Sequence, residues 1–175
     1  MEVKKRNKLL YVAIFAAYAV FAFAFFTIGL QPVRSAETVY AEESKEADSI
    51  LNIPSISLTA PVMQSTVTDN VLSVPDQIAA SYSTSTNKTL IFGHSSTIFK
   101  DLNLVKIGEI ATYNEKSYQI TDITEKQKND ISMPEILAPA SKDTIVLMTC
   151  SGELIPNSDG DHTHRLIITA ERAEI

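Results

Sequence analysis

The sequence predicts a mostly β domain, either a barrel or a sandwich, behind an apolar N-terminal segment. From residue 50 onward short apolar stretches recur, some with the two-residue alternation of a half-buried strand, and prolines punctuate the gaps between them. Only two short stretches, 99–102 and 134–137, favour helices. Short strands at this spacing are typical of all-β barrels and sandwiches rather than of parallel sheets with helical crossovers.

The predicted strands follow from local patterns. Apolar residues occupy every second position from Ile56 to Val62, as expected for a strand with one buried face. The segments 109–113 and 117–123 flank a turn sequence at 114–116, which favours a hairpin. Further strands are predicted from apolar runs at 88–94, 143–150 and 165–170.

A membrane anchor is predicted at the N-terminus. A basic cluster within residues 4–8 precedes a stretch from Leu9 to Leu30 that contains no charged residue. At a rise of about 1.5 Å per residue, a helix of this length spans a hydrocarbon core about 30 Å thick. The basic residues before this stretch and the acidic residues after it favour a cytoplasmic N-terminus.

We therefore expect three parts in the chain. Residues 1–30 form a cytoplasmic tip and a single transmembrane helix in the cell membrane, 31–49 a polar linker, and 50–175 an extracytoplasmic domain. A cleaved signal peptide is the alternative, because Val39 and Ala41 are small residues of the kind found before a cleavage site. Both interpretations export the domain.

The overall charge and the cysteine content limit the function classes. The formal net charge is −6 and the isoelectric point is near 5.0, which argues against nucleic acid as a partner. Cys150 is the only cysteine, so the chain forms no intramolecular disulfide. An unpaired thiol is unusual in an exported protein, and Cys150 is therefore a candidate for chemistry.

Three residues at predicted strand ends could carry that chemistry. Cys150 closes an apolar run, where a rigid strand holds a side chain accurately. Because the thiolate is the nucleophile, Cys150 needs a base, and His94 after Gly93 closes another run. Arg165 opens the last predicted strand and can stabilise negative charge on a carbonyl oxygen if its strand neighbours that of Cys150.

A non-catalytic interpretation competes with this one. Free cysteine is often a small buried hydrophobe, and a strand-end arginine often forms a surface ion pair. The chain would then be a membrane-anchored β-barrel binding module with an inert cysteine in closed, apolar surroundings. The enzyme hypothesis instead requires the side chains of Cys150, His94 and Arg165 to converge in an open groove.

The polar segment from Asp159 to His164 contains two aspartates and two histidines that could bind a divalent ion. Their spacing matches no dedicated metal loop, so a solvated acidic turn is favoured. His162 and His164 are accordingly expected in solvent. The proposed chemistry requires no cofactor.

The ordered set of motifs resembles the sortases, the cysteine transpeptidases of bacterial cell envelopes. Residues 146–150, Val-Leu-Met-Thr-Cys, match their Thr-Leu-X-Thr-Cys motif except at the first position. Gly93-His94 matches their histidine context, and Arg165 before an apolar run matches their arginine. The stretch 99–109 also looks like the segment that follows the histidine in this family. The resemblance covers roughly residues 50–172.

The resemblance implies a closed eight-stranded β-barrel and a transpeptidation. Cys150 would cleave a Leu-Pro-X-Thr-Gly-like sorting signal of a surface protein between threonine and glycine and form a thioacyl enzyme. His94 would protonate the leaving amine and activate an acceptor amine, from a cell-wall precursor or a pilin-like protein. Arg165 would stabilise the oxyanion, and Thr149 would contribute to the site.

The resemblance also concerns substrate binding and metal. It places four apolar residues where the family receives the leucine and proline of its signal, although plain core packing explains them equally well. These residues are Ile131, Met133, Ile136 and Leu137. Some sortases bind calcium, but no feature of this sequence identifies such a site.

A second enzyme class remains as an alternative. L,D-transpeptidases also place histidine before cysteine, but their cysteine lies in a Ser-X-Gly-Cys-like motif. Here the glycine, Gly152, follows Cys150.

Overall fold

The computed structural model describes residues 36–68, 71–85, 87–158 and 160–174. The predicted membrane anchor at 1–30 and the first residues of the predicted linker lie outside these ranges. Within them, no helix has the length and apolar character needed to cross a bilayer. The segment expected to be a linker contains a helix, α2 (Ala36–Glu43), followed by a short turn.

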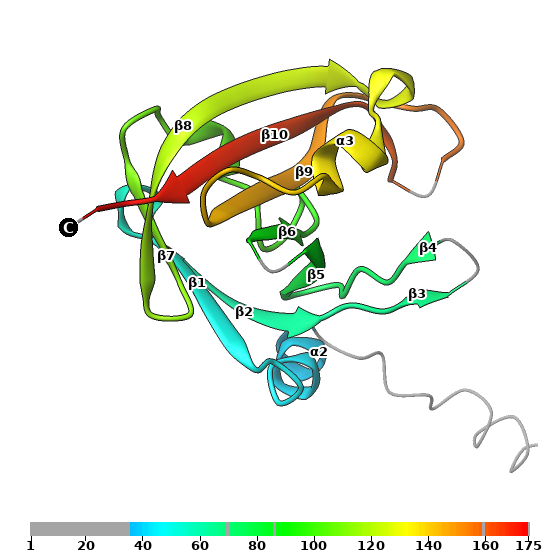
Figure 1. The fold of residues 1–175 in the computed structure, drawn as a ribbon. Coiled ribbons are helices and arrows are strands. Elements are labelled where there is room, and N and C mark those ends of the chain that lie inside the picture. The colour runs from blue at the N-terminus through cyan, green and yellow to red at the C-terminus, as the bar shows by residue number, and fades with distance from the viewer. Residues whose placement is uncertain (1–35, 69–70, 86, 159, 175) are drawn as a thin grey trace, which may run out of the picture. The chain divides into compact units, whose positions relative to one another are not determined.

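Eight strands close into a barrel, as the resemblance implies (Figure 1). Their order around the barrel is β1-β2-β5-β6-β9-β10-β8-β7. Two neighbouring pairs, β2 with β5 and β6 with β9, are parallel, and the other pairs are antiparallel. The barrel strands are β1 Ser49–Ile53, β2 Leu58–Gln64, β5 Ala79–Ser85, β6 Lys88–Phe92, β7 Ile110–Tyr113, β8 Lys116–Gln127, β9 Thr144–Leu154 and β10 His162–Arg172.

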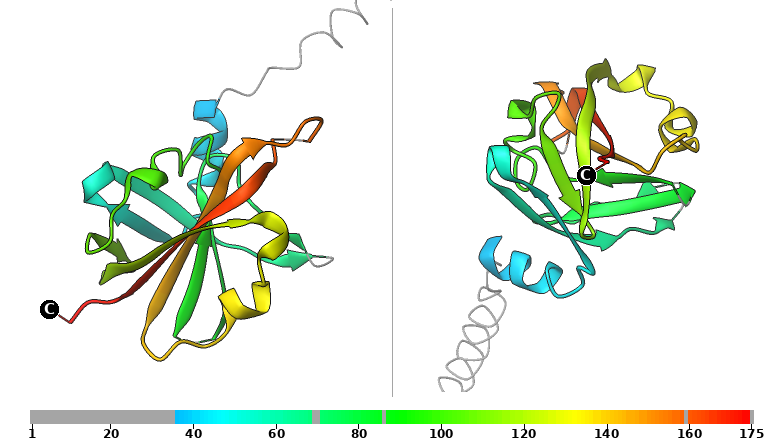
Figure 2. Two further views of the ribbon diagram at one scale, coloured as in Figure 1. Left: turned by 90° about the horizontal axis from the view of Figure 1, so that it is seen from above. Right: turned by 60° about the vertical axis from the view of Figure 1, so that its left-hand side comes forward.

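The two parallel pairs require long connections, because a tight hairpin joins only antiparallel strands. Between β2 and β5 the chain forms a small hairpin, β3 (Val67–Thr68) and β4 (Val71–Leu72), which projects beyond the barrel (Figures 1 and 2). Between β6 and β9 lie the turns that follow β6, the β7–β8 hairpin and the short helix α3 (Met133–Leu137). Short 3-10 helices complete the fold: η1 Pro54–Ile56, η2 Leu102–Leu104 and η3 Lys128–Asp130.

Local sequence explains the tightest connection. The β7–β8 hairpin turns on Asn114 and Glu115, which have φ angles of 49° and 62°. Two successive residues in the left-handed conformation match the right-handed twist of the flanking strands. Apart from glycine, asparagine is among the residues that adopt this conformation most readily. The hairpin prediction is confirmed, although Lys116 belongs to β8 rather than to the turn.

The interior of the barrel is the main hydrophobic core. Inward-facing residues such as Leu147 and Ile168 are fully buried, and Phe99 from the turn after β6 closes the core at one end. The cluster comprises Leu51, Ile53, Ala60, Val62, Ala79, Ile91, Phe99, Leu102, Val105, Ala111, Tyr113, Tyr118, Ile120, Ile145, Leu147, Leu166, Ile168 and Ala170.

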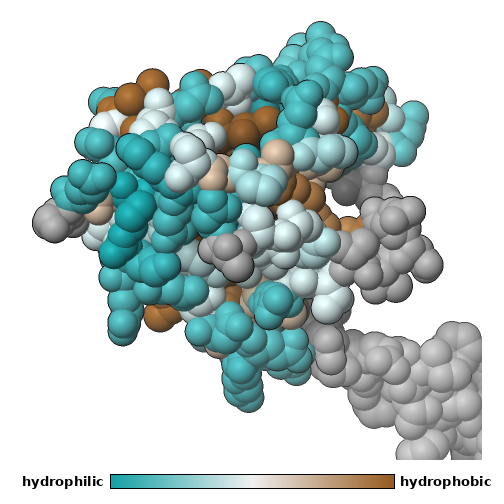
Figure 3. All heavy atoms as spheres, in the orientation of Figure 1, coloured by the Kyte–Doolittle hydropathy of each residue, from teal (hydrophilic) through white to brown (hydrophobic). Residues whose placement is uncertain are grey.

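A second apolar cluster lies on the outer face of the sheet. Its members alternate with those of the core along each strand, as Val146 does between Ile145 and Leu147. The helix α3 contacts β5 and β6 and covers part of this cluster. Its buried members are Ala80, Leu90, Phe92, Val146 and Ile167. Figure 3 shows apolar side chains in a hollow on the face drawn there, among hydrophilic neighbours.

Candidate active site

Cys150 lies within β9 and not at its end. β9 continues to Leu154 because β10 pairs with it beyond Cys150, so the prediction that the strand ends at Cys150 is wrong. On the other side of β9, the strand β6 stops at Phe92, opposite Met148. Cys150 is therefore paired on one side only, and it is half-buried rather than enclosed.

His94 follows β6 at the point where β6 leaves β9. The Gly93 amide donates to the Met148 carbonyl oxygen at 3.3 Å, and the Thr149 hydroxyl donates to the Gly93 carbonyl oxygen at 2.8 Å. Both backbone polar groups of Gly93, just before His94, are thus bound by the two residues that precede Cys150. The half-buried His94 and Cys150 occupy corresponding places at the end of the parallel β6–β9 pair.

Gly93 permits a close approach of side chains from the turn that follows it. A Cβ atom at this position would lie 2.6 Å from Ile98 Cγ2 and 3.3 Å from Phe99 Cδ2. The His94 carbonyl oxygen accepts hydrogen bonds from the Thr97 and Phe99 amides, which folds the turn back over Gly93. Gly93 therefore makes room for the protein's own turn.

Arg165 lies directly opposite Cys150 in the β9–β10 register, so the condition that their two strands are neighbours is met. Residues opposite each other in an antiparallel pair have Cβ atoms about 4.5–5.5 Å apart. Arg165 does not open the strand, because β10 begins at His162. Its guanidinium group is bound to the preceding segment: Nη2 donates to Asp161 Oδ1 at 2.6 Å, and Nη1 donates to two carbonyl oxygens, those of His162 and His164, at 2.9 Å each.

Asp161 connects two loops beside the candidate site. Its carboxylate accepts a hydrogen bond from Lys128 in η3 as well as from Arg165. The Lys128 hydrogen bond, followed by that of Arg165, holds the pKa of Asp161 well below its usual range. The charged carboxylate therefore links the β8–α3 connection to the β9–β10 connection.

The two histidines of this segment are not simply solvated, which corrects the expectation from the sequence. Both belong to β10 and both are half-buried. His162 Nδ1 lies 3.1 Å from the Gly152 carbonyl oxygen, and His164 Nδ1 lies 2.8 Å from Thr163 Oγ1. The alternation of His162 and His164 is a strand pattern, and it is the signal that could have extended the last predicted strand backward.

Gly152 forms a bulge two residues after Cys150. The register between β9 and β10 shifts here, and Gly152 has a φ angle of +74°. A Cβ atom at this position would lie 2.5 Å from His164 Nδ1 and 2.7 Å from Thr163 Oγ1. The left-handed backbone therefore favours glycine, and a larger residue would have to displace the Thr163 and His164 side chains.

A cavity of about 370 Å³ adjoins Cys150. Its walls come from the turn after His94, from β8 and from both strands of the β9–β10 pair. The lining residues are Ser95, Phe99, Lys100, Asn103, Glu125, Thr149, Cys150, Ser151, Gly152, His162 and Leu166. The sequence indicated Cys150 and Thr149 but gave no reason to include Glu125 or His162.

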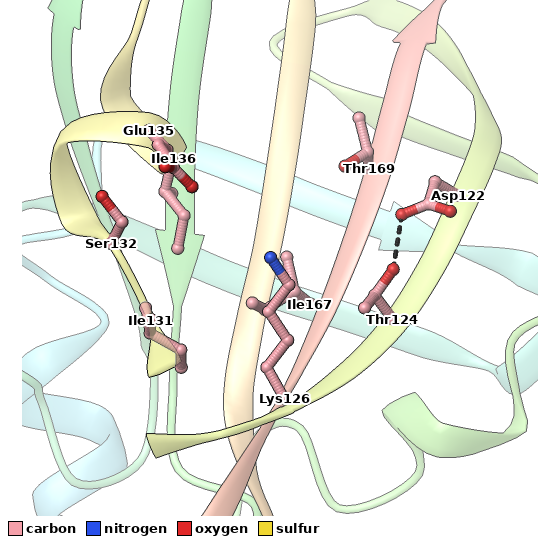
Figure 4. Close-up of a pocket in the computed structure, with 9 residues that line it drawn as sticks. All are labelled: Asp122, Thr124, Lys126, Ile131, Ser132, Glu135, Ile136, Ile167 and Thr169. Atoms are coloured by element: carbon pink, nitrogen blue, oxygen red, sulfur yellow. Dashed lines mark hydrogen bonds between the residues drawn. The ribbon is translucent and has the colours of Figure 1, made fainter. Parts of the chain in front are cut away.

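The four apolar residues expected at the substrate groove lie together, around α3. Ile131, Met133, Ile136 and Leu137 are half-buried and pack against the outer cluster, not inside the barrel. Between α3, β8 and β10 lies a second cavity of about 190 Å³, in which Ile131 and Ile136 face Ile167 and Lys126 (Figure 4). Asp122, Thr124, Ser132, Glu135 and Thr169 complete its lining.

Metal ligands do not gather in the described part of the chain. No group of three or more His, Cys, Asp or Glu side chains there is arranged to hold an ion. Asp159 of the candidate metal segment lies outside the described residues, and Asp161 is engaged by Lys128 and Arg165.

Comparisons with known proteins agree with this fold. The family model of the sortase domain matches residues 51–173. One similar solved structure is sortase C-1 from Actinomyces oris, with 20% identity over 74% of both chains and a TM-score of 0.53. Another is sortase A from Listeria monocytogenes, with 17% identity over 74% of this chain and 88% of that one and a TM-score of 0.55. A third is Pilus Island 1 sortase C2 from Group B Streptococcus, with 23% identity over 83% of both chains and a TM-score of 0.55. At such identities, these structures show a common fold alone. A search of curated proteins gave no significant match.

Proposed function

Because the chain belongs to the sortase family, we propose that it is a cysteine transpeptidase that cleaves a sorting signal of a surface protein and transfers the acyl part to an amine. The observation that carries this proposal is the arrangement around β9. Arg165 lies opposite Cys150 on one side, and Thr149 fixes the backbone before His94 on the other. An inert cysteine would instead require closed surroundings, whereas Cys150 is half-buried and borders a cavity.

In the proposed first step, the Cys150 thiolate attacks the carbonyl carbon between threonine and glycine of a Leu-Pro-X-Thr-Gly-like signal. The C–N bond breaks and a thioester forms, while His94 gives a proton to the leaving amine. In the second step an acceptor amine attacks the thioester and the thiolate leaves. The same histidine accepts the proton from the attacking nitrogen.

Arg165 is proposed to stabilise the oxyanion with the donors that remain to it. A guanidinium group has five N–H donors, and three of them are used for Asp161 and the two backbone carbonyls. The Nε–H and the second Nη2–H are left for a substrate oxygen. The three fixed contacts restrict the motion of the guanidinium, and such preorganisation is what makes electrostatic stabilisation effective.

The outer apolar cluster around α3 supports binding of the acyl side of the signal. Met148 and Ile167 belong to the outer cluster with α3, and Cys150 follows Met148 on the same face by the alternation of the strand. A leucine and a proline seated against Ile136 and Leu137 would therefore continue along β9 toward the thiol. Burial of a leucine side chain contributes about 1.5–3 kcal/mol.

The proposed setting is the outer side of the cell membrane, with the predicted anchor at residues 1–30. Sorted surface proteins or pilins would be the substrates, and a cell-wall precursor or a pilin-like protein would supply the amine. The structure of a similar protein, sortase C of Streptococcus pneumoniae, has been used to explain its specificity for pilin substrates.

The test uses the full-length chain in mild detergent, mixed with a panel of fluorogenic Leu-Pro-X-Thr-Gly peptides and triglycine. We expect cleavage between threonine and glycine, with a Cys150-bound thioester seen by mass spectrometry. Cys150→Ala should abolish both signals.

Two outcomes would contradict the proposal. Failure of the folded wild-type protein to cleave any peptide of the panel would remove the substrate class. Cleavage that persists in Cys150→Ala would remove Cys150 as the nucleophile.

A further inference from the structure

We propose that the helix α2, in the segment expected to be a linker, positions His94 for proton transfer. This inference rests on the proposed transpeptidase function and adds two positioning residues to it, Glu43 and Thr97. The contacts run from Glu43 on α2 to the segment 75–77, and from that segment to the turn that begins with His94.

Glu43 is the last residue of α2, and its carboxylate binds two successive backbone amides. Oε1 accepts a hydrogen bond from the Asp76 amide and Oε2 from the Gln77 amide, both at 2.8 Å. Hydrogen bonds to an ionised carboxylate are about twice as strong as those between neutral groups. The carboxylate of Glu43 thus fixes the backbone just before Ile78, which is fully buried beside the start of β5.

Thr97 joins this segment to the turn of His94. Its hydroxyl donates to the Asp76 carbonyl oxygen at 2.7 Å, and its amide donates to the His94 carbonyl oxygen at 3.3 Å. Asp76 is therefore bound by α2 through its amide and by the turn through its carbonyl group. A displacement of α2 passes to the turn through this one residue.

His94 depends on the backbone of its turn for its position. Among the residues that the structure describes, none is hydrogen-bonded to the His94 imidazole, so no carboxylate orients the ring. The turn is bound to β9 through Gly93 before it, and Phe99 anchors it in the core after it. Between these two ends, the bond from Thr97 to Asp76 is the one that ties the turn to another described segment.

Misplacement of His94 should slow one kind of substrate more than another. When the C–N bond of a sorting signal breaks, the leaving nitrogen takes a proton from His94, because an unprotonated amide nitrogen is a poor leaving group. A thioester of the same acyl peptide gives the same thioacyl enzyme at Cys150. Its C–S bond breaks with release of a thiolate, which leaves without a proton. The ratio of the amide rate to the thioester rate therefore reports how well His94 is placed.

The test compares these two substrates with the full-length protein in mild detergent. Formation of the thioacyl enzyme is followed in single turnovers by rapid quenching and mass spectrometry. We expect Thr97→Val to lower the maximal amide rate roughly tenfold at an unchanged half-saturating concentration, and the thioester rate by less than about twofold. Thr97→Ser keeps the hydroxyl and should restore most of the amide rate.

Glu43→Gln should lower the amide rate roughly threefold and leave the thioester rate nearly unchanged, because the charge and one of the two acceptor oxygens are lost. The double variant of Glu43→Gln and Thr97→Val should lose no more than Thr97→Val alone, since both residues act through Asp76. Glu37→Gln, at an exposed position of the same helix, is the matched control and should leave both rates unchanged.

The ratio of the two rates does not depend on the folded fraction, so partial unfolding of a variant does not imitate the expected result. A ratio equal to that of wild type in Thr97→Val or in Glu43→Gln would overturn the role of α2, while thioacyl enzyme formed by the wild-type protein from the amide upholds the proposed function. Wild-type protein that forms no thioacyl enzyme from any amide signal would overturn both.

Discussion

The Thr149 hydroxyl donates a buried hydrogen bond of 2.8 Å to the Gly93 carbonyl oxygen and so joins the strand of Cys150 to the turn of His94. The strand β6 ends one residue before Gly93, so this side-chain bond continues the contact between the two strands where the backbone ladder stops. Thr149 is thereby a positioning residue in the proposed reaction, in a role different from that of the nucleophile beside it.

Replacement of Thr149 by valine should therefore impair both stability and catalysis. Valine keeps the shape but leaves the buried Gly93 carbonyl without this partner, at a cost of about 1–3 kcal/mol in the free energy of unfolding. We expect urea denaturation to show this loss and peptide cleavage to fall mainly in kcat. Thr149→Ser, which keeps the hydroxyl, should restore most of the rate. Equal rates in the valine and serine variants would show that the hydrogen bond does not position His94.

Gly152→Ala should disrupt the bulge after Cys150. A methyl group at this position meets the His164 ring and the Thr163 hydroxyl, in addition to the cost of a left-handed backbone. The control is Gly108→Ala, where φ is also positive, at +91°, but nothing lies within 4 Å of the added atom. Gly152→Ala should be destabilised by about 1–3 kcal/mol more than Gly108→Ala in thermal or urea unfolding. Similar losses of unfolding free energy in both variants would mean that the Thr163 and His164 side chains move aside at no cost.

Asp161→Asn should weaken the hold on Arg165 and change the pH dependence of stability. The pKa of Asp161 is lowered by Lys128 and then by Arg165, so its contribution is present above the unfolded-state pKa of about 3.9 and is lost as the pH falls toward the lowered folded-state value. Wild type should be more stable than Asp161→Asn at pH 7, and the difference should shrink below about pH 4. Unfolding curves at both pH values measure it. A difference that stays constant with pH would exclude the carboxylate charge as its cause.

Glu43→Gln should loosen α2 from the barrel. The Glu43 carboxylate accepts hydrogen bonds from the Asp76 and Gln77 amides, both at 2.8 Å, and the Thr97 hydroxyl donates to the Asp76 carbonyl oxygen at 2.7 Å. In this geometry each amide is bound by a different carboxylate oxygen, and glutamine replaces one of these oxygens by an NH2 group, so the Asp76 and Gln77 amides should exchange hydrogen faster. Glu37→Gln, an exposed position on the same helix, is the control. Unchanged exchange in Glu43→Gln would show that other contacts hold this segment.

Local patterns were sufficient for much of the barrel. The apolar runs that became β6, β9 and β10, and the β7–β8 hairpin, were visible because their alternation or their turn residues are local properties of the chain. β5 was missed because its sequence, Ala-Ala-Ser-Tyr-Ser-Thr-Ser, is small and polar and is held as a strand by its neighbours β2 and β6. The β3–β4 hairpin was missed because each strand has only two residues.

The sequence by itself determined which residue types are at hand for chemistry: one thiol, a histidine after Gly93, and an arginine before the last apolar run. It left open whether the strands of Cys150 and Arg165 are neighbours, which the β9–β10 pairing shows. Tertiary structure alone decided the rest. It set the direction of the Arg165 guanidinium and the hydrogen bond from Thr149 to Gly93. It also brought Glu125, Ser151 and His162 to the lining of one cavity. These arrangements depend on packing of the folded chain, which no local pattern encodes.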